Sequence, residues 1–350
     1  MLALAGRPLG IETVHLDPAG DACAGEVARL IVGAYDDPAL VRQLCRGASA
    51  LTVDLEQVPA GAFRHIPPDI PVWPPPAAVA VTQDRLLEKL LFRELGIPGP
   101  AFAAVDGPGD LDHAARAVGL PLLLKTRSGG YDGRGQELVR DAAGLLPAWR
   151  RLDDRPQIAE ELVAFEREAS VIAVRAADGE TRTYPLAENR HEGGILRVTR
   201  VPARTDAAAA EEARQAALRV AERLGHVGVL TLELFEAGGR LLANEIAPRV
   251  HNSGHWTIEA AETSQFENHL RAVCGLPLGS TEQLRPAAMV NLIGTVPSTA
   301  AVLGIPGARL HLYGKEPRAG RKLGHVTITA ADEETLAERV ARVEALLADG

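Results

Sequence analysis

The sequence is poor in aromatic residues and in cysteine, and both shortages narrow what the protein can be. Phe, Trp and Tyr make up only 4% of the 350 residues, so the 46% that are hydrophobic are mostly Ala, Leu and Val, as in ordinary α/β or α+β enzymes. Cys23, Cys45 and Cys274 form no CxxC pair, which argues against a disulfide framework and against a structural zinc site. We therefore expect a globular protein of the reducing cytoplasm.

Long apolar runs and an excess of positive charge are also missing. No uncharged apolar stretch approaches about 18 residues, and the opening MLALAGRPLG has no basic leader, so we expect neither secretion nor a membrane span. The formal net charge of -9 argues against nucleic acid or an anionic membrane as the main partner. An anionic small molecule would therefore have to be bound by local cations.

The pattern of predicted helices and strands divides the chain into three parts. Residues 1–76 alternate short helices and strands, as in a small parallel α/β domain, and end in six prolines within positions 67–76, which predict a linker. Residues 77–287 predict a mixed α+β domain, and residues 288–350 predict a small β-rich domain with a final helix. In the middle part the predicted helices are 85–95, 110–118, 206–224 and 263–274, and the predicted strands are 122–125, 157–163, 169–176, 182–187, 195–201 and the hairpin 228–246.

A strand that ends in a lysine and runs into a glycine-rich loop is the strongest local signal. It reads LLLKTRSGGYDGRGQ over residues 122–136, with the lysine at position 125. Glycines let backbone amides approach phosphate oxygens, and the lysine supplies a charge for the anion. A Walker A loop is excluded because the lysine precedes the glycines. The segment predicts a cover over phosphate, with a flexible hairpin turn as the alternative.

Two glutamates stand among apolar residues in the predicted hairpin. A three-residue loop at 238–240 would place Glu233 opposite Glu245, and the two carboxylates would form a Mg²⁺ site. A two-residue loop would instead put Asn244 opposite Glu233, so the metal site requires the longer loop or a β-bulge. The alternative is that one glutamate pairs with Arg249 and the other is solvated.

Three further segments carry polar groups in patterns that suit a ligand site. The acids of EELVAFERE (160–168) are placed to accept hydrogen bonds from an adenine amine or ribose hydroxyls, although a solvated charged turn is the commoner meaning. The loop RVHNSGHW (249–256) has none of the HExxH, paired cysteine or GxSxG patterns of zinc sites and serine hydrolases. The cationic cluster YGKEPRAGRKLGH (313–325) predicts an anion site, or else a solvated basic turn.

Taken together, these segments resemble the ATP-grasp superfamily, and within it the 5-(carboxyamino)imidazole ribonucleotide synthases, from residue 1 to about residue 330. RVHNSGHWT and GRKLGH are the blocks that favour this family over its transformylase and carboxylase relatives. The resemblance implies an ATP-grasp fold with a Rossmann-like N-terminal domain and an ATP-dependent carboxylase of purine biosynthesis. The other blocks in the family's order are QDRLLEKLLFRELGIP (83–98), LLLKTRSGGYDGRGQ, EELVAFEREASV, YPLAENRHEGGILR (184–197), GVLTLELF and NEIAPRVHNSGHWTIEA.

The resemblance also implies ligands for individual residues. Mg²⁺, with Mn²⁺ as the alternative, would be held by Glu233 and Glu245. The residues implied to bind ATP are Arg85, Lys125, Gly130, Tyr131, Asp132, Gly133, Arg134, Gly135, Gln136, Glu160, Glu161, Leu162, Val163, Glu168, His226, Asn244 and Glu245. The residues implied to bind 5-aminoimidazole ribonucleotide are Glu56, Tyr131, Asp132, Arg134, Asn252, Lys315, Arg321 and Lys322.

The implied reaction begins with transfer of the γ-phosphoryl group of ATP to bicarbonate. The carboxyphosphate formed, or CO₂ released from it, then reacts with the amine of the substrate. The catalytic residues implied are Lys125, Arg249, His251 and His255, with one of the two histidines orienting bicarbonate or the amine. The family is typically dimeric, so we expect a homodimer. The alternatives are another ATP-grasp ligase, such as a formate-dependent glycinamide ribonucleotide transformylase, or a truncated ATP-binding protein without chemistry.

One departure from the family pattern concerns the beginning of the sequence. Family members usually start with a strand and a GGGQLGR-type turn ahead of the helix that MLALA begins here. Such a turn presents backbone amides to the phosphate of the substrate. We therefore expect the first parallel strand and part of the phosphate site to be missing from the sequence as given. A start assigned too far downstream is the favoured reason, and a protein that binds its substrate poorly is the alternative.

Overall fold

The structure is a computed structural model that describes residues 1–130 and 133–348. Within these residues nine strands form one antiparallel sheet, called the central sheet below, in the order β14-β13-β9-β11-β12-β15-β17-β16 with β10 against β9. Its strands are β9 (Arg167–Arg175), β10 (Thr181–Thr183), β11 (Ala187–Glu192), β12 (Ile195–Val201), β13 (Gly228–Ala237), β14 (Arg240–Ala247), β15 (Ala287–Ile293), β16 (Ala308–Leu312) and β17 (Lys322–Thr329). The strand predicted at 182–187 is β10 and stops at Thr183, and β11 was not predicted.

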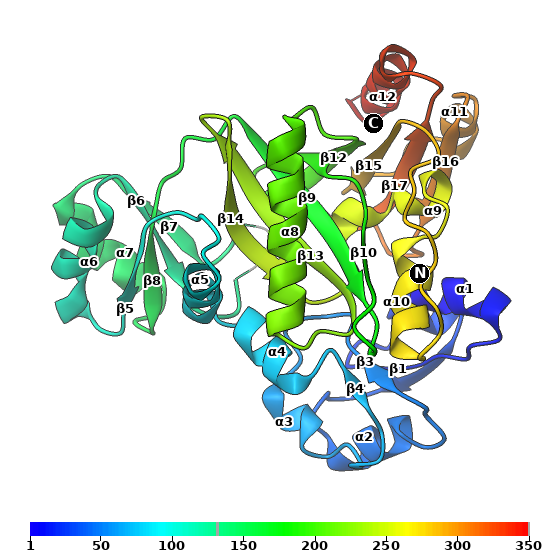
Figure 1. The fold of residues 1–350 in the computed structure, drawn as a ribbon, viewed down its shortest axis with the longest axis horizontal. Helices are drawn as coiled ribbons and strands as arrows, with labels where there is room; N and C mark the ends of the chain where they lie inside the picture. Colours follow the sequence, from blue (N-terminus) through cyan, green and yellow to red (C-terminus); the bar gives the residue numbers. More distant parts are fainter. Residues whose placement is uncertain (131–132, 349–350) are drawn as a thin grey trace.

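Alternation along β13 separates the two faces of the central sheet. Leu230, Leu232 and Leu234 point to one face, where they are 0–3% exposed under helix α8 (Ala207–Arg223). The Asp206 side chain accepts a hydrogen bond from the Ala208 N–H, which fixes where α8 begins. In Figure 1, α8 lies along this face.

The opposite face of the central sheet is apolar at one end and polar at the other. At the apolar end Val174 and Val229 pack beneath Trp256 and helix α10 (Gln265–Val273). Towards the other end Ser170 lies opposite Glu233, so polar side chains replace the apolar ones on the same two strands. At this polar end the face is not covered by the apolar core, and the candidate site lies there. The short elements before α10 are η5 (Asn252–Gly254) and α9 (Thr257–Ala260).

The C-terminal elements extend the central sheet. Strand β12 pairs with β15, and β15 pairs with β17, so hydrogen bonding continues across residues 287–288. Val290, Ile328 and Val340 belong to the core under the last helix. The helices of this part are α11 (Thr299–Leu303) and α12 (Glu333–Ala348), which agrees with the predicted final helix.

Four of the described strands form a separate antiparallel sheet, called the small sheet below, in the order β5-β8-β6-β7. It lies at one end of the molecule, on the left of Figure 1. Its core includes Leu122, Leu124 and Trp149. The elements are α5 (Arg85–Glu94), β5 (Phe102–Val105), η3 (Pro108–Asp110), α6 (Leu111–Val118), β6 (Leu122–Thr126), β7 (Gln136–Val139), η4 (Ala142–Gly144), α7 (Leu145–Arg151) and β8 (Gln157–Glu161).

The N-terminal part has the expected parallel pairing, but as two separate pairs of strands within the described chain. The prediction of a linker at 67–76 is wrong in part. Val72 and Trp73 stand between prolines and still form a short strand that pairs with residues 51–52. The elements are α1 (Leu2–Gly6), η1 (Arg7–Leu9), β1 (Val14–Asp17), η2 (Cys23–Glu26), β2 (Arg29–Val32), α2 (Pro38–Leu44), β3 (Leu51–Thr52), α3 (Ala60–Phe63), β4 (Val72–Trp73) and α4 (Pro76–Thr82). Over residues 1–130 and 133–348, no helix has both the length and the apolar character needed to cross a membrane.

Candidate active site

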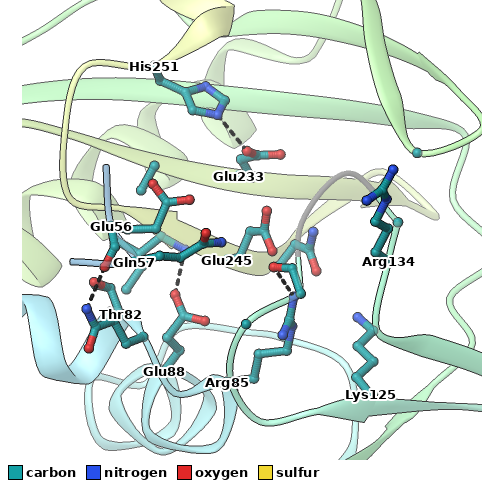
Figure 2. Close-up of a pocket in the computed structure, with 18 of the residues that line it drawn as sticks. Glu56, Gln57, Thr82, Arg85, Glu88, Lys125, Arg134, Glu233, Glu245 and His251 are labelled. Carbon is teal, nitrogen blue, oxygen red and sulfur yellow. Dashed lines mark hydrogen bonds and ion pairs between the residues drawn. The ribbon is translucent and has the colours of Figure 1, made fainter. Parts of the chain in front are cut away.

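A cavity of about 870 Å³ lies where the small sheet, the polar part of the central sheet and the N-terminal part meet. Figure 2 shows Glu233 and Glu245 above Glu88 and Arg85, which both come from α5, with Lys125 and Arg134 on the right. The residues predicted from the sequence that line it are Glu56, Arg85, Lys125, Gly130, Gly133, Arg134, Gln136, Glu168, Glu233, Asn244, Glu245, Arg249, His251, Asn252 and Lys322.

The hairpin of β13 and β14 brings Glu233 opposite Glu245, although not through the three-residue loop. Ala237 pairs with Arg240, so the loop is only Gly238-Gly239, and the three-residue loop that was one of the two conditions considered is not formed. The register then shifts between Glu233 and Leu234, which leaves Asn244 as the extra residue of a bulge. The bulge is the other condition under which the two glutamates were expected to meet, and it moves Glu245 to the face that carries Glu233.

Two consecutive residues of α5 hold the backbone on both sides of Glu245. Lys89 Nζ donates a hydrogen bond to the Asn244 carbonyl oxygen at 2.6 Å, and Glu88 Oε1 accepts one from the Ile246 N–H at 2.9 Å. Both side chains are 3% exposed. Buried hydrogen bonds of this kind fix local geometry, because breaking one leaves a polar group without a partner. We infer that α5 holds the bulge and aims Glu245 into the cavity.

The carboxylates of the central sheet are not fully neutralised. Burial, and next the neighbouring Glu233, raise the pKa of Glu245 above its ordinary value. Burial also raises the pKa of Glu233, but His251 outweighs burial and brings that pKa below its ordinary value, since its Nε2 lies 2.9 Å from Glu233 Oε1. Burial, and then Glu245, raise the pKa of Glu88 well above the ordinary value. Glu233 and Glu245 on the central sheet, together with Glu88 on the adjoining helix α5, therefore give this part of the cavity an excess of acidic groups.

On the opposite wall, two lysines meet one buried carboxylate. Lys125 Nζ lies 2.9 Å and Lys89 Nζ 3.4 Å from Glu160 Oε2. Burial raises the pKa of Glu160, but the two lysines outweigh burial and lower it to about 2. The expectation that Glu160 accepts hydrogen bonds from adenine or ribose is therefore corrected for its side chain, because this carboxylate is 2% exposed and paired with two lysines.

Arg85 joins the base of the glycine-rich loop to α5. Its two terminal nitrogens donate to the carbonyl oxygens of Thr126 at 2.9 Å and Gly130 at 3.1 Å. A Cβ on Gly130 would lie 2.6 Å from the Arg134 carbonyl oxygen, so only glycine fits there without a shift. Gly135 has φ +72° and lies behind the loop, off the cavity. The predicted residues Tyr131 and Asp132 lie outside the described residues.

Two predicted histidines do not reach the cavity. His226 is fully buried, and its Nε2 lies 2.9 Å from the Val229 carbonyl oxygen, so its assignment to ATP is corrected. His255 is 7% exposed, its ring packs against the rings of Phe266 and His325, and it is not among the residues that line the cavity. Burial, and then His325, hold the pKa of His255 well below its ordinary value. Both residues lie in connecting segments, His226 between α8 and β13 and His255 after η5, and these segments pack against α10.

Other predicted residues lie near the cavity without lining it. The Glu161 carboxylate accepts a hydrogen bond from the Ala101 N–H at the end of β8. Arg321 reaches Asp21 of the N-terminal part at 3.7 Å, and the Lys315 ammonium lies over the Tyr313 ring. Leu162 and Val163 follow β8 and also lie outside the lining set.

Sequence reasoning missed His191, which lines the cavity from β11. Its Nδ1 lies 2.7 Å from Glu168 Oε2. Burial lowers its pKa, but Glu168 outweighs burial, and the pKa ends above its ordinary value. The sequence did offer a signal, because His191 lies in the block YPLAENRHEGGILR (184–197), after a short run in which apolar and polar residues alternate. Phe165 was also missed. It lines the cavity, and its ring stacks on that of Phe235 with 4.8 Å between the ring centroids.

Comparison with known families divides the chain in three. The family model described as ribonucleotide synthetase preATP-grasp domain matches residues 1–83. The ATP-grasp domain model matches residues 90–266, and the model described as phosphoribosylaminoimidazole carboxylase C-terminal domain matches residues 287–339. An ATP-grasp fold with an N-terminal preATP-grasp domain, as expected from the sequence, is confirmed.

Individual relatives are similar over almost the whole chain. The N5-carboxyaminoimidazole ribonucleotide synthase of Pseudomonas aeruginosa is 50% identical over 347 residues, which are 99% of this chain and 96% of the relative. The crystal structure of N5-carboxyaminoimidazole ribonucleotide synthetase from Thermus thermophilus is 51% identical, with a TM-score of 0.95 over 99% of this chain and 95% of that one. The synthase from Aspergillus clavatus in complex with ADP and 5-aminoimidazole ribonucleotide is 31% identical, with a TM-score of 0.90 over 99% of this chain and 94% of that one.

Proposed function

We propose that this chain, which belongs to the family of N5-carboxyaminoimidazole ribonucleotide synthases, carboxylates 5-aminoimidazole ribonucleotide with ATP and bicarbonate in purine biosynthesis. The products are 5-(carboxyamino)imidazole ribonucleotide, ADP and phosphate. The observation that carries the proposal is one cavity in which Glu233 and Glu245 face Arg85 and Lys125 across the glycine-rich loop. This arrangement suits a nucleoside triphosphate whose phosphate charge is met by the basic side chains and by a divalent ion on the two glutamates.

The carboxylate pair fits a Mg²⁺ ion, with Mn²⁺ as the alternative. The raised pKa of Glu245 reflects burial and the charge of Glu233, a conflict that a divalent cation relieves. Asn244, the bulged residue between them, offers an amide oxygen at the same place. A bound divalent ion would neutralise phosphate charge and align the γ-phosphoryl group with its acceptor.

The phosphates of ATP are assigned to Lys125, Arg85 and the loop that begins at Gly130. Lys125 Nζ donates a hydrogen bond to Glu160, which orients the ammonium group so that it can contact a phosphoryl oxygen as the charge on that oxygen grows. Glu168 and His191, paired at the far end of the cavity, are assigned to the nucleoside. Phe165 and Phe235 supply apolar surface close by.

The ribonucleotide is assigned to the end of the cavity beside the N-terminal part. Glu56 and Arg249 form an ion pair there, and Asn252 and Lys322 line the same end. Lys322 would meet the phosphate of the ribonucleotide, with Lys315 and Arg321 on the preceding segment in the same region. Arg249 stays charged beside Glu56 and is placed to hold an anionic acceptor such as bicarbonate.

The chemistry proceeds in two displacements within this enclosure. An oxygen of bicarbonate attacks the γ-phosphorus of ATP, and ADP leaves, which produces carboxyphosphate. The amine nitrogen of the ribonucleotide then bonds to the carboxyl carbon, and phosphate leaves while the nitrogen loses a proton. The loop over the cavity keeps water away from the labile mixed anhydride between the two steps.

Three finer assignments complete the proposal. The protein works in the cytoplasm as a homodimer, and we retain the division into residues 1–76, 77–287 and 288–350 as its domains. Each rests on the sequence pattern and on family membership.

The test is phosphate release from ATP with each acceptor supplied in turn. We expect release that requires both bicarbonate and 5-aminoimidazole ribonucleotide, with labelled bicarbonate carbon recovered in the product. Formate with glycinamide ribonucleotide should give none. Release with formate would identify a transformylase instead, and ATP binding by calorimetry without release under any acceptor would identify a binding protein without chemistry.

A further inference from the structure

His251 is held from both sides of its ring. On one side its Nε2 lies 2.9 Å from Glu233 Oε1. On the other side its Nδ1 lies 2.8 Å from the hydroxyl oxygen of Ser253 and 3.3 Å from the backbone nitrogen of the same residue. Ser253 belongs to η5 and is 0% exposed. The imidazole therefore has a buried partner on the side away from the cavity.

Behind Ser253, a run of buried polar side chains crosses three strands of the central sheet. Ser170 Oγ on β9 lies 2.8 Å from Ser253 Oγ, and Asn189 Nδ2 on β11 lies 2.9 Å from Ser170 Oγ. Thr199 Oγ1 on β12 lies 2.9 Å from Asn189 Oδ1. The exposed fractions are 0% for Ser170 and Thr199 and 5% for Asn189. We call Thr199, Asn189, Ser170 and Ser253 together the hydroxyl–amide chain.

One backbone group decides the direction of every hydrogen bond in this chain. The Ser253 N–H can only donate, so His251 Nδ1 must accept and carries no proton. The Ser253 hydroxyl therefore donates to Nδ1, which leaves its oxygen to accept from the Ser170 hydroxyl. Ser170 has then used its only proton and must accept from another residue.

The remaining two bonds follow from the same count of protons. Asn189 must present its NH₂ group to Ser170, which settles which way the amide lies. Its oxygen then accepts from the Thr199 hydroxyl. All donors point towards His251, and the neutral ring is left with its proton on Nε2, facing Glu233.

We propose that the hydroxyl–amide chain positions His251 as the tautomer with its proton on Nε2, so that His251 donates a hydrogen bond to Glu233 rather than taking a proton from substrate. His251 is then the partner that orients a carboxylate facing the cavity, as outer partners do around metal-binding side chains. One carboxylate oxygen of Glu233 is engaged by the imidazole, and the other is left for the cavity. The role of Glu233 in this inference rests on the proposed function.

The first experiment reads the ring nitrogens of His251 directly. Protein labelled with ¹⁵N-histidine is studied by NMR without ATP or metal at about pH 8.5, well above the ordinary histidine pKa of about 6.5. His251→Gln identifies the signals by their loss. We expect Nε2 to carry the proton and Nδ1 to be unprotonated. A proton on Nδ1 in the wild-type protein would overturn the inference, whatever the enzyme does.

The second experiment removes the hydroxyl that touches the ring. In Ser253→Ala the backbone N–H still donates to Nδ1 but the shorter hydrogen bond from the hydroxyl is lost, so we expect the two His251 nitrogen signals to move while the proton stays on Nε2. We also expect kcat to fall about tenfold or more with the KM for ATP changed less than twofold, because the ring is held less firmly. Thr199→Val, at the far end of the chain, should shift the same signals by a smaller amount. Unchanged signals in Ser253→Ala would contradict the inference even if the variant were less stable.

Thr231→Val is the matched control. Thr231 is also 0% exposed and lies on the strand that carries Glu233, and within the described part of the chain its hydroxyl has no hydrogen-bond partner. It should leave the His251 signals and kcat unchanged. Because the signals are read without substrate, a protein that fails to carboxylate the ribonucleotide still gives a clear answer on the tautomer.

Discussion

The two walls of the cavity carry buried charge in different ways. On the wall of the small sheet and α5, Lys125 and Lys89 both meet Glu160, and the pKa of that carboxyl falls to about 2. On the wall of the central sheet, Glu245 stands beside Glu233 and has a raised pKa because burial and the second carboxylate disfavour its charge. One wall is balanced by the protein itself, and the other is left with a negative charge that a ligand must balance.

This difference explains which wall depends on a cation from solution. Isolated buried charge is costly, so a folded protein pairs it or coordinates it. Lys89 and Lys125 pair the buried Glu160 carboxylate within the chain, so the two lysines stabilise the fold as well as lying beside the proposed ATP site. In the glutamate pair only Glu233 has such a partner, His251, and under the proposed function a divalent cation would balance the rest. Three predictions follow from this contrast and are given from the largest effect to the smallest.

Glu245→Gln should remove ATP turnover, by at least about 100-fold, because one of the two carboxylates that would hold the divalent ion is lost. The fold should remain, and without ATP the unfolding temperature should be no lower than that of the wild type, since a like-charge contact with Glu233 has gone. Phosphate release and thermal unfolding measure the two effects. Glu236→Gln is the control, because Glu236 lies on the same hairpin but pairs with Arg167. Near-normal turnover in folded Glu245→Gln would remove the metal assignment.

Lys89→Met should lower the free energy of unfolding by about 3 to 5 kcal/mol, because it takes one of two cations from a buried carboxylate. It also removes the hydrogen bond to the Asn244 carbonyl oxygen. Urea denaturation measures the loss. Arg223→Met breaks an exposed pair with Glu94, which water screens, and should lower the free energy of unfolding far less. Equal losses in the two variants would show that the buried cluster does not stabilise the fold.

Acid should weaken the balanced wall in a defined pH range. The pKa of Glu160 is about 2 in the folded protein and 4.5 ordinarily, so the unfolded chain binds the proton first as pH falls. The stabilisation is complete above about pH 4.5 and is lost progressively towards pH 2, by about 3 kcal/mol in all. Urea denaturation between pH 5.5 and about pH 3 should therefore show a steeper fall for wild type than for Glu160→Gln. Parallel curves would mean that the lysines do not hold this carboxylate charged.

Much of the site could be read from the sequence because its parts are local. The lysine at the end of a strand, the four glycines after it and the two glutamates among apolar neighbours all lie within short segments. Gly130 must be glycine because its position has no room for a Cβ, and this requirement is visible as a glycine in the sequence. The cap at Asp84 and the end of α5 follow in the same way from side chain and turn chemistry.

The errors fall where a distant part of the chain decides the outcome. His226 and His255 stand in strand and loop contexts that resemble that of His191, yet only His191 faces the cavity. The difference depends on which face of the central sheet α10 covers, and the residues next to each histidine in the sequence do not indicate this. The sequence left the choice between a longer hairpin loop and a bulge open for a related reason, since the bulge at Asn244 is held by hydrogen bonds from α5, about 155 positions away in sequence.

The sequence by itself determined the type of fold, the glycine-rich loop and the two glutamates, because periodicity, glycine and buried charge leave marks within a few residues. Only the tertiary structure decided the bulge that brings Glu245 beside Glu233, the pairing of Glu160 with two lysines and the line of hydroxyl and amide groups behind His251. These features depend on hydrogen bonds and ion pairs between elements far apart in the chain. Their partners are chosen by packing, which a local pattern cannot encode.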